Sequence, residues 1–520
     1  MELKICERFP WPLLKVGTAL KSASYSLHPA MDGLVNSVPR MRATHLLLFA
    51  TYILFVSKWT NILPGATAER LLQGFKATPD PTESSFQTLL TDPTGNFSLS
   101  FLRVNKTQLA LAVLHVPSSD PLWLANPTEL ASWSETTQFF FNGSLVISDP
   151  TSRVFWSTQT EGDFVVLLES SNLQIQMLAD APKVLWQSFD FPSDTLVENQ
   201  NLTANQSLMS SNGIYFMRLG YDFWGLYANF GGKTDQIYLK HTALEARAEI
   251  VLGQPPIYAH VNPEGYLGMY QNGSKPVDVA AFNSFQRSVN GFLRLRLEQD
   301  GNLRAYLWDG SSWVLNYQAI SDSCQLPSPC RSYGLCRPGY GCSCLDNGTE
   351  FRSGEDCFSV ETGDFCDENV VGDNFWVLSR TGLELPFKEL MQYEPTTTKE
   401  ECELLCENNC TCWGAVFNNA SGFCYTVDYP IQTLVAIGDQ TKIGYFKVRP
   451  VAGKKKRNAG TAVGYAVGAV AAVALIGVVG LWAYRTWRKK IQEEDGEVSP
   501  GPYKNLGAAS FKSIEMSNTQ

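Results

Sequence analysis

The chain has 520 residues, in which 41 Lys and Arg stand against 51 Asp and Glu, for a formal net charge of −10. That length predicts roughly three to four domains, and the acidic balance argues against a nucleic-acid partner, because phosphate contacts need a cationic face. The five histidines include no pair close enough in sequence to suggest a metal site, and no nucleophile–histidine motif occurs, so we expect no enzymatic activity, catalytic residue, metal or other cofactor.

The first apolar segment, His45–Val56, has the length of a secretory h-region and is too short to span a bilayer. Two arginines precede it, and Ala66–Ala68 supplies small residues for cleavage. We interpret residues 1–68 as an N-terminal extension and a signal peptide. The alternatives are a buried helix or an uncleaved anchor extended to Leu63, and translation from Met41 would leave the extension out.

Between Glu69 and Ser323 the sequence consists of short alternating runs broken by Gly, Asn, Asp and Pro, without a sustained helical period. This pattern predicts an all-β prism or barrel. Four runs have strand length and β-branched or aromatic residues: Phe139–Ile147, Val154–Ser157, Phe164–Leu168 and Leu173–Leu178.

Short units in which a tight turn leads into a strand recur at Asn142–Ile147, Ser171–Ile175 and Asp300–Tyr306, which indicates repetition around an axis. The run Leu185–Leu196 (LWQSFDFPSDTL) closely resembles the signature block of the plant S-domain, or G-type lectin, receptor-like kinases. Gly291–Gln318 resembles the S-locus glycoprotein region of the same family.

The resemblance extends to Leu145–Ile147 and Val154–Thr158, which are similar to the family's bulb-type lectin domain. It implies a mainly β, multidomain chain with a bulb-lectin-type β-prism over residues 69–184. An S-locus-glycoprotein-like β domain is expected to follow over residues 185–320.

Mannose-binding relatives carry the pattern Gln-x-Asp-x-Asn-x-Val-x-Tyr, whose period of two points the polar side chains to one face of a strand. The first two units in this chain have lost most of that set. The third keeps Asp300, Asn302 and Tyr306, with Glu298 and Arg304 elsewhere in the pattern. These three are the candidate carbohydrate residues, although a strand-turn scaffold retained for folding is the favoured interpretation.

Twelve of the thirteen cysteines crowd into Cys324–Cys424, which indicates an oxidising compartment and a disulfide framework. The first six fit an EGF-like module over residues 321–360, and six cysteines allow fifteen pairings. The resemblance implies the pairs Cys324–Cys336, Cys330–Cys342 and Cys344–Cys357.

The second block, residues 361–450, contains Thr398–Glu401, a capping box that starts a helix. Cys402 and Cys406 then lie on one face of that helix. The run around them is similar to the PAN/apple domain of the same receptor family, an α+β fold. The resemblance implies the pairs Cys402–Cys424, Cys406–Cys412 and Cys366–Cys410.

A second apolar segment, Gly460–Tyr484, has 25 uncharged residues, enough to cross a bilayer as a single transmembrane helix. Basic residues flank both ends, so the positive-inside rule does not orient it. The nine Asn-x-Ser/Thr acceptor sites do, because all lie between the two apolar segments. We therefore expect a single-pass type I protein of the plasma membrane with an extracellular N-terminal ectodomain. The acceptor sites are Asn96, Asn105, Asn142, Asn201, Asn205, Asn272, Asn347, Asn409 and Asn419.

Gly460, Gly464 and Gly468 recur every four residues and place small side chains on one face of the predicted span. This face is a hypothetical contact for a homodimer or a membrane co-receptor; the alternative is that Gly is simply common in membrane helices. Residues 485–520 are expected to form a short cytoplasmic tail, too short for the kinase of the receptors that the chain resembles.

The leading functional hypothesis is a non-enzymatic cell-surface receptor-like glycoprotein, which recognises an extracellular protein or glycan ligand and acts through a membrane partner. The alternative is a carbohydrate-binding or cell-wall-attachment lectin-like protein without a signalling role.

Overall fold

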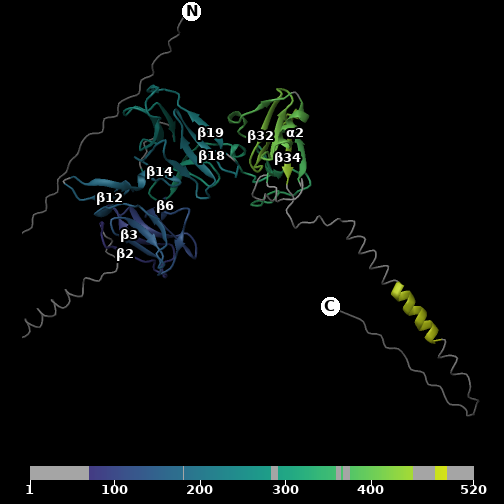
Figure 1. Cartoon of the computed structure of the whole chain (residues 1–520), viewed down its shortest axis with the longest axis horizontal. Coiled ribbons are helices and arrows are strands. Elements are labelled where there is room, and N and C mark those ends of the chain that lie inside the picture. Colours follow the sequence, from purple (N-terminus) through teal and green to yellow (C-terminus); the bar gives the residue numbers. More distant parts are fainter. Residues whose placement is uncertain are drawn as a thin grey trace, which may run out of the picture. The chain divides into compact units, whose positions relative to one another are not determined.

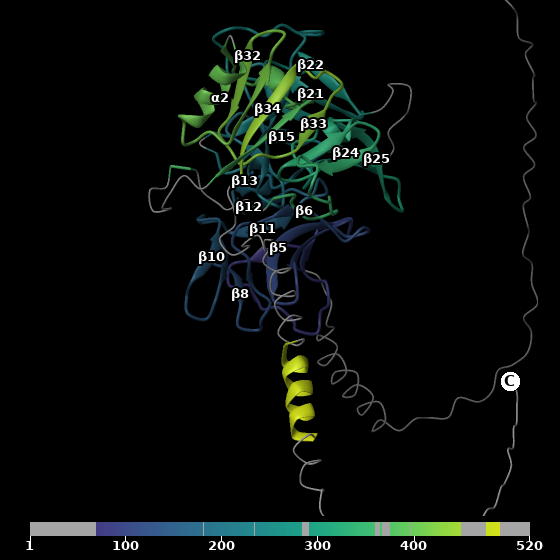
Figure 2. The same ribbon diagram turned by 90° about the vertical axis from the view of Figure 1, so that its right-hand side faces the viewer.

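The computed structural model describes residues 69–179, 181–232, 234–282, 291–358, 365–366, 375–396, 398–448 and 475–488. The predicted extension and signal peptide, most of the predicted membrane span with Gly460, Gly464 and Gly468, and the predicted tail beyond residue 488 lie outside these residues. Strands dominate the described chain (Figures 1 and 2). The mainly β class predicted from the alternating runs is confirmed.

Three antiparallel sheets fold the first β region, which we call the first prism, around one shared cluster of buried side chains. The alternating pattern explains this, since every second residue of each strand is apolar and turns toward the other sheets. In spatial order, the sheets contain β1 (Leu71–Leu72), β11 (Phe164–Leu167), β12 (Leu173–Met177) and β13 (Lys183–Gln187); β10 (Val154–Ser157), β9 (Leu145–Ser148), β8 (Gln138–Phe141) and β2 (Lys76–Ala77); and β3 (Phe86–Thr91), β4 (Phe97–Arg103), β5 (Gln108–His115) and β6 (Asp120–Leu124), with β7 (Ala131–Ser132) paired to β5.

The single strand expected across residues 139–147 is instead the hairpin β8–β9. The chain reverses at Gly143, whose φ of 104° is open to glycine and strained for other residues. The other three expected strands match β10, β11 and β12 to within a residue. The predicted boundary between residues 184 and 185 falls inside β13, because that strand continues its pairing with β12 as far as Gln187.

The next β region, which we call the second prism, repeats this plan with three further four-stranded antiparallel sheets. Its buried side chains belong to a cluster that continues into the cysteine-rich part of the chain. The sheets contain β14 (Thr195–Val197), β23 (Phe292–Leu297), β24 (Leu303–Trp308) and β25 (Trp313–Gln318); β15 (Asn201–Leu202), β20 (Tyr258–Asn262), β21 (Tyr266–Tyr270) and β22 (Asp278–Ala281); and β16 (Ser207–Met209), β17 (Tyr215–Leu219), β18 (Phe223–Ala228) and β19 (Gln236–Thr242). The short 3-10 helix η1 (Ser188–Asp190) connects the two prisms.

The two cysteine blocks share a sheet. The hairpin β26 (Gly334–Arg337) and β27 (Gly341–Cys344) belongs to the first block, and β33 (Leu434–Ala436) and β29 (Leu383–Glu384) belong to the second. Strands β26 and β33 pair in parallel, with Leu335 opposite Leu434. Short 3-10 helices, η2 (Ser323–Gln325) and η3 (Lys388–Leu390), precede the hairpin and follow β29.

The second block also forms a five-stranded sheet covered by α2 (Lys399–Glu407), which Figure 2 shows beside β32 and β34. Thr398 is the N-cap of α2, and its side chain accepts a hydrogen bond from the Glu401 N–H at 3.2 Å. The helix start predicted from the capping box is confirmed. The sheet order is β28 (Trp376–Thr381), β34 (Lys442–Val448), β31 (Gly414–Asn418), β32 (Phe423–Val427) and β30 (Glu394–Pro395).

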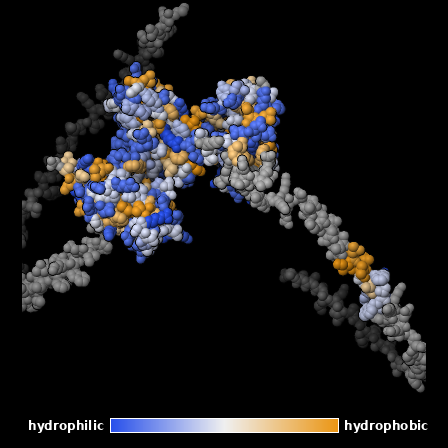
Figure 3. Space-filling view, viewed as in Figure 1, coloured by the Kyte–Doolittle hydropathy of each residue, from blue (hydrophilic) through white to orange (hydrophobic). Residues whose placement is uncertain are grey.

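A separate helix covers residues 475–488 and exposes its apolar side chains, such as Ile476 at 72% and Trp482 at 69%. Figure 3 shows hydrophobic residues gathered at one end of this helix. Among the described residues, no helix combines the length and the apolar character needed to cross a membrane.

Candidate functional site

The candidate carbohydrate residues lie together at the turn between β23 and β24, but their polar groups are bonded within the chain. The Asp300 carboxylate forms an ion pair with Arg304 at 2.6 Å, and the Tyr306 hydroxyl donates to Glu298 at 2.7 Å. Burial, and next the hydrogen bond to the Glu298 carboxylate, raise the pKa of Tyr306 to about 12. Asn302 is 1% exposed, and its amide bonds one backbone N–H and one backbone carbonyl beyond β25. A sugar would have to displace these partners.

The two corresponding turn-and-strand units of the first prism, at Asn142–Ile147 and Ser171–Ile175, do not offer a sugar site either. Their polar side chains are bonded within the chain, or the residues of the mannose-binding pattern are missing. Asn142 is exposed in the β8–β9 turn. Asn172 is buried, and its amide donates to Gln187 at 2.9 Å. Gln174 donates to the same Gln187 oxygen, and Gln176 donates to Gln174, so the amides on this sheet satisfy one another.

The predicted cysteines are brought together in six disulfides with Cα–Cα distances from 4.8 to 5.6 Å. They are the same pairs that the resemblance implies. The bridges are Cys324–Cys336, Cys330–Cys342, Cys344–Cys357, Cys366–Cys410, Cys402–Cys424 and Cys406–Cys412.

Every predicted glycan acceptor is an exposed residue of the described chain, from Asn96 in the first prism to Asn419 beside the sheet that α2 covers. An asparagine must reach the solvent to carry a glycan. The nine positions therefore meet the steric requirement for modification.

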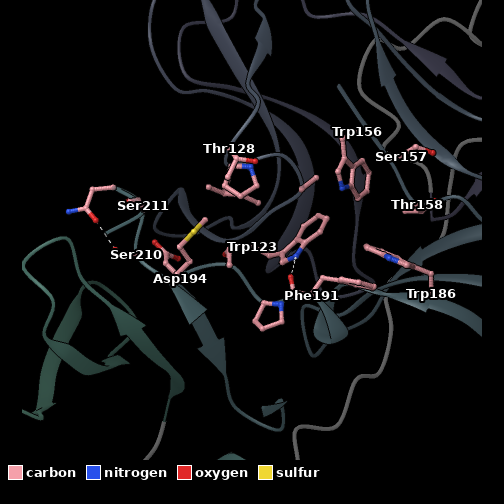
Figure 4. Close-up of a pocket in the computed structure, with 18 of the residues that line it drawn as sticks. Trp123, Thr128, Trp156, Ser157, Thr158, Trp186, Phe191, Asp194, Ser210 and Ser211 are labelled. Carbon is pink, nitrogen blue, oxygen red and sulfur yellow. Dashed lines mark hydrogen bonds between the residues drawn. The ribbon is translucent and has the colours of Figure 1, made fainter. Parts of the chain in front are cut away.

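A cavity of about 830 Å³ lies where the two prisms meet. Each sheet of the first prism supplies one tryptophan to it, Trp123 from β6, Trp156 from β10 and Trp186 from β13, with ring centres 5.7 to 5.9 Å apart. The turn after β16 in the second prism lines the other side with Ser210 and Ser211. Figure 4 shows the tryptophans and these serines on opposite sides of the cavity.

The linker after η1, residues 191–194, lines one edge of this cavity. Phe191 is 57% exposed, but its ring stacks on Trp186 at 5.7 Å, and its carbonyl accepts a hydrogen bond from the Trp123 indole at 2.7 Å. Its position is therefore fixed although its ring is open to solvent, as a preformed binding surface requires.

The polar lining is uncharged apart from one neutralised carboxylate. Asp194 accepts two hydrogen bonds from Arg296, at 2.9 and 3.1 Å, and both side chains are largely buried. Ser193 is 9% exposed, and its hydroxyl is buried without a partner, while its carbonyl accepts from the Met209 N–H at 2.9 Å. A buried unbonded hydroxyl is unusual in a native fold.

A second contact joins the prisms through an aromatic and charged junction. Arg294 of β23 forms an ion pair with Asp120 of β6 at 3.0 Å and lies 3.9 Å above the Trp313 ring. His115 of β5 stacks on Phe292. Burial, with a smaller effect from the Arg294 charge, lowers the pKa of His115 to about 4.

No cluster of His, Cys, Asp and Glu suited to a metal ion occurs in the part of the chain that the structure describes.

Comparison with known proteins decides the family. Over 491 residues the chain is 52% identical to the PAN domain-containing protein At5g03700 of Arabidopsis thaliana, covering 94% of this chain and 100% of that protein. The chain belongs to the plant S-domain family of lectin and PAN-domain proteins. The D-mannose binding lectin family matches residues 121–215, which include the tryptophan side of the cavity and the linker.

Other S-domain relatives are more distant. The G-type lectin S-receptor-like serine/threonine-protein kinase At5g35370 of Arabidopsis thaliana is 26% identical, over 66% of this chain and 41% of that kinase. The chain thus spans less than half the length of this relative. EP1-like glycoprotein 4 of the same plant is 26% identical, over 69% of this chain and 86% of its own length.

The cavity residues were not anticipated from the sequence of this S-domain protein. One local signal was present, since Trp123, Trp156 and Trp186 recur roughly every thirty residues, a spacing within the range of structural repeats. Phe191, Ser193 and Asp194 lie within the signature block Leu185–Leu196, but the side of the cavity formed by Ser210 and Ser211 has no such signal, because these are ordinary polar residues until the second prism folds against the first.

Proposed function

We propose that this S-domain protein is a non-enzymatic, single-pass glycoprotein of the plasma membrane, which recognises an extracellular protein or glycan and acts through a membrane partner. The observation that carries the proposal is a surface suited to the cell exterior, with six disulfides and nine exposed glycan acceptors. Disulfides persist outside the reducing cytosol, and N-glycans are added in the secretory pathway.

The membrane part of the proposal is supported by the uncharged segment at residues 460–484 and by the exposed apolar side chains of the helix at 475–488. The receptor part is supported by a relative whose name describes it as a receptor-like kinase. We propose that signals pass to a second membrane protein, with the face of Gly460, Gly464 and Gly468 as the contact.

Surface biotinylation and proximity labelling test this in plant cells that express the full chain fused to a labelling enzyme. We expect the chain to be biotinylated on intact cells, to lose mass on enzymatic deglycosylation, and to label a defined membrane protein. Replacing Gly460, Gly464 and Gly468 with Leu should reduce that labelling, whereas Leu at Ala462, Ala466 and Val473, on the opposite face of the predicted helix, should not. Reduced cysteines and unmodified asparagines in the mature chain would refute the proposal.

The cavity between the prisms favours one second candidate, a glycan-binding protein of the cell wall without a signalling role. It predicts that the chain fractionates with wall polysaccharide and that proximity labelling recovers no membrane partner. The same labelling experiment therefore separates the two candidates.

A further inference from the structure

We propose that an N-glycan on Asn409 packs into an apolar groove beside α2 and is a structural part of the second cysteine block. This role goes beyond recognition and signalling. It rests on the proposed function only for passage through the secretory pathway, where the glycan is added. The occupant of the groove is the chain's own covalently attached glycan core, not a free ligand.

The groove lies along one face of α2 and has a volume of about 480 Å³. The helix residues that line it follow one another at spacings of three and four, which places them on that face. Among them, Leu404 and Leu405 are 50% and 44% exposed. Glu394 and Pro395 of the edge strand β30 complete the lining. Apolar side chains that gather in a groove gain free energy when another group covers them.

The glycan acceptor Asn409 lines the same groove, two residues beyond the end of α2. Its backbone is fixed, because its N–H donates to the Cys406 carbonyl at 3.2 Å and its carbonyl accepts from the Lys447 ammonium at 3.2 Å. Its side-chain oxygen accepts from the N–H and the hydroxyl of Thr411, at 3.0 and 2.9 Å. These bonds leave its Nδ2, the atom that carries an N-glycan, without a hydrogen-bond partner within the described chain. The covalent bond therefore holds the first sugars near the exposed leucines at high effective concentration.

The charge of the groove favours this neutral occupant over a second copy of the chain. Glu394 and Glu401 are the charged residues of the lining, and both are exposed. A symmetric contact between two copies would bring like carboxylates together, which is unfavourable. The hydroxyl and acetamido groups of a glycan core can donate hydrogen bonds to carboxylates, and the C–H faces of its rings can pack on leucine side chains. A basic peptide would also match the charge, but it would have to displace the attached glycan.

The test is amide hydrogen exchange on the full-length protein, made in mammalian cells whose N-glycans are kept in the high-mannose form and purified in detergent. Glycopeptide mass spectrometry should first find Asn409 occupied. Asn409→Gln removes this glycan alone, and we expect exchange in α2 to become about threefold to tenfold faster. Asn419→Gln is the matched control, because it removes an exposed acceptor of the same block that does not line the groove, and it should leave α2 unchanged.

Two further samples separate the glycan from the side chain that carries it, because Asn409→Gln also loses the bonds to Thr411. Endoglycosidase H leaves the first N-acetylglucosamine on each acceptor, so the trimmed parent chain should keep slow exchange in α2. Thr411→Val keeps Asn409 but destroys its acceptor signal, and it should exchange as fast as Asn409→Gln. Thr411→Ser keeps both the signal and the hydroxyl, so its glycosylated fraction should behave like the parent chain.

Leu405→Gln tests the contact between the glycan and the groove. In the glycosylated chain it should speed exchange in α2, and the double variant with Asn409→Gln should be no faster than Asn409→Gln alone. Leu252→Gln, at a leucine that is 85% exposed in the second prism, should leave α2 unchanged. If Asn409→Gln fails to fold, Leu405→Gln in the glycosylated chain gives the same readout.

Three results would overturn the inference: Asn409 unmodified while other acceptors carry glycans, exchange in α2 that neither Asn409→Gln nor Leu405→Gln changes, or effects of these two variants that simply add. These outcomes are separate from failure of the proposed function. A chain that labels a membrane partner at the cell surface but has a bare Asn409 loses only this inference. A chain whose glycan protects α2 but that labels no membrane partner loses only the proposed function.

Discussion

Lys447 is a buried cation whose ammonium contacts backbone carbonyls and aromatic rings instead of a carboxylate. Its side chain is 1% exposed, and its ammonium donates to the Cys406 carbonyl at 2.9 Å and to the Asn409 carbonyl at 3.2 Å. Phe365 and Phe375 place their rings 5.3 and 5.1 Å from the same nitrogen. Carbonyls at the end of α2 lack helical partners and carry partial negative charge, which makes this end a favourable position for a cation.

Lys447→Met should destabilise the α2 end of the second cysteine block. The variant keeps an apolar side chain of similar length but removes the two hydrogen bonds that the ammonium donates. The Cys406 and Asn409 carbonyls keep the backbone N–H donors of Asn409 and Cys412, so we expect a loss of roughly 1 kcal/mol. We expect faster amide hydrogen exchange in α2 and β34 and a lower unfolding temperature under non-reducing conditions. Lys240→Met, at an exposed lysine of β19, is the control and should have little effect. Equal effects of the two variants would show that Lys447 has no special role.

At the scale of elements, the sequence pattern correctly predicts those features that depend on neighbouring residues in the chain. The capping box gave the start of α2, and alternating runs gave β10, β11 and β12, because caps and strand periods depend on neighbours in sequence. The pattern predicts one strand in place of the hairpin at Gly143, because apolar residues continue on both sides of the turn. The junction and the cavity depend on contacts such as Arg294 with Asp120, which no local pattern encodes.

Thr398 allows a direct test of the predicted helix cap. Thr398→Ala removes the acceptor for the Glu401 N–H, a loss of about 1 kcal/mol for a typical N-cap. Cys402 and Cys406 are tied to the sheet and the following loop, so the helix should loosen only in its first turn. We expect faster amide exchange confined to residues 399–402 in Thr398→Ala. Thr398→Asp, which again offers an N-cap acceptor, should exchange as slowly as the parent chain. Loosening along the whole helix would mean that the disulfides do not hold α2 in place.

At the scale of the molecule, the two prisms face each other in two places, at the cavity and at the charged aromatic junction. The cavity is open to a ligand, whereas the junction is filled by its own side chains. His115 packs in the junction against Phe97, Phe292 and Trp308, with ring centres 4.9 to 5.8 Å from its own. Arg294 and Asp120 are the charged groups beside it, and protonation of His115 would add a second cation next to Arg294.

This junction predicts that acid weakens the fold around β5 and β23. The folded chain keeps the pKa of His115 at about 4, below its ordinary value of 6.5. Between these values the unfolded chain binds a proton that the folded chain does not, so stability is complete above pH 6.5 and falls as the pH drops toward 4. The loss is on the order of 2 kcal/mol, and unfolding temperatures measured from pH 4 to 7.5 should show it.

His115→Phe separates this effect from the general acid sensitivity of the chain. Phenylalanine keeps the packing against Phe292 and Trp308 but cannot take up a proton. It also gives up the hydrogen bond between His115 and the Ser118 hydroxyl, which costs a similar amount at every pH. The variant should therefore lose some stability throughout but have a flatter pH dependence. His260→Gln is the comparison outside the junction. Burial also lowers the pKa of His260, so this variant should flatten the pH dependence in the same direction, but it should leave the fold around β5 and β23 as acid-sensitive as in the parent chain. If His115→Phe keeps the parent slope between pH 4 and 6.5, the junction does not respond to acid through this imidazole.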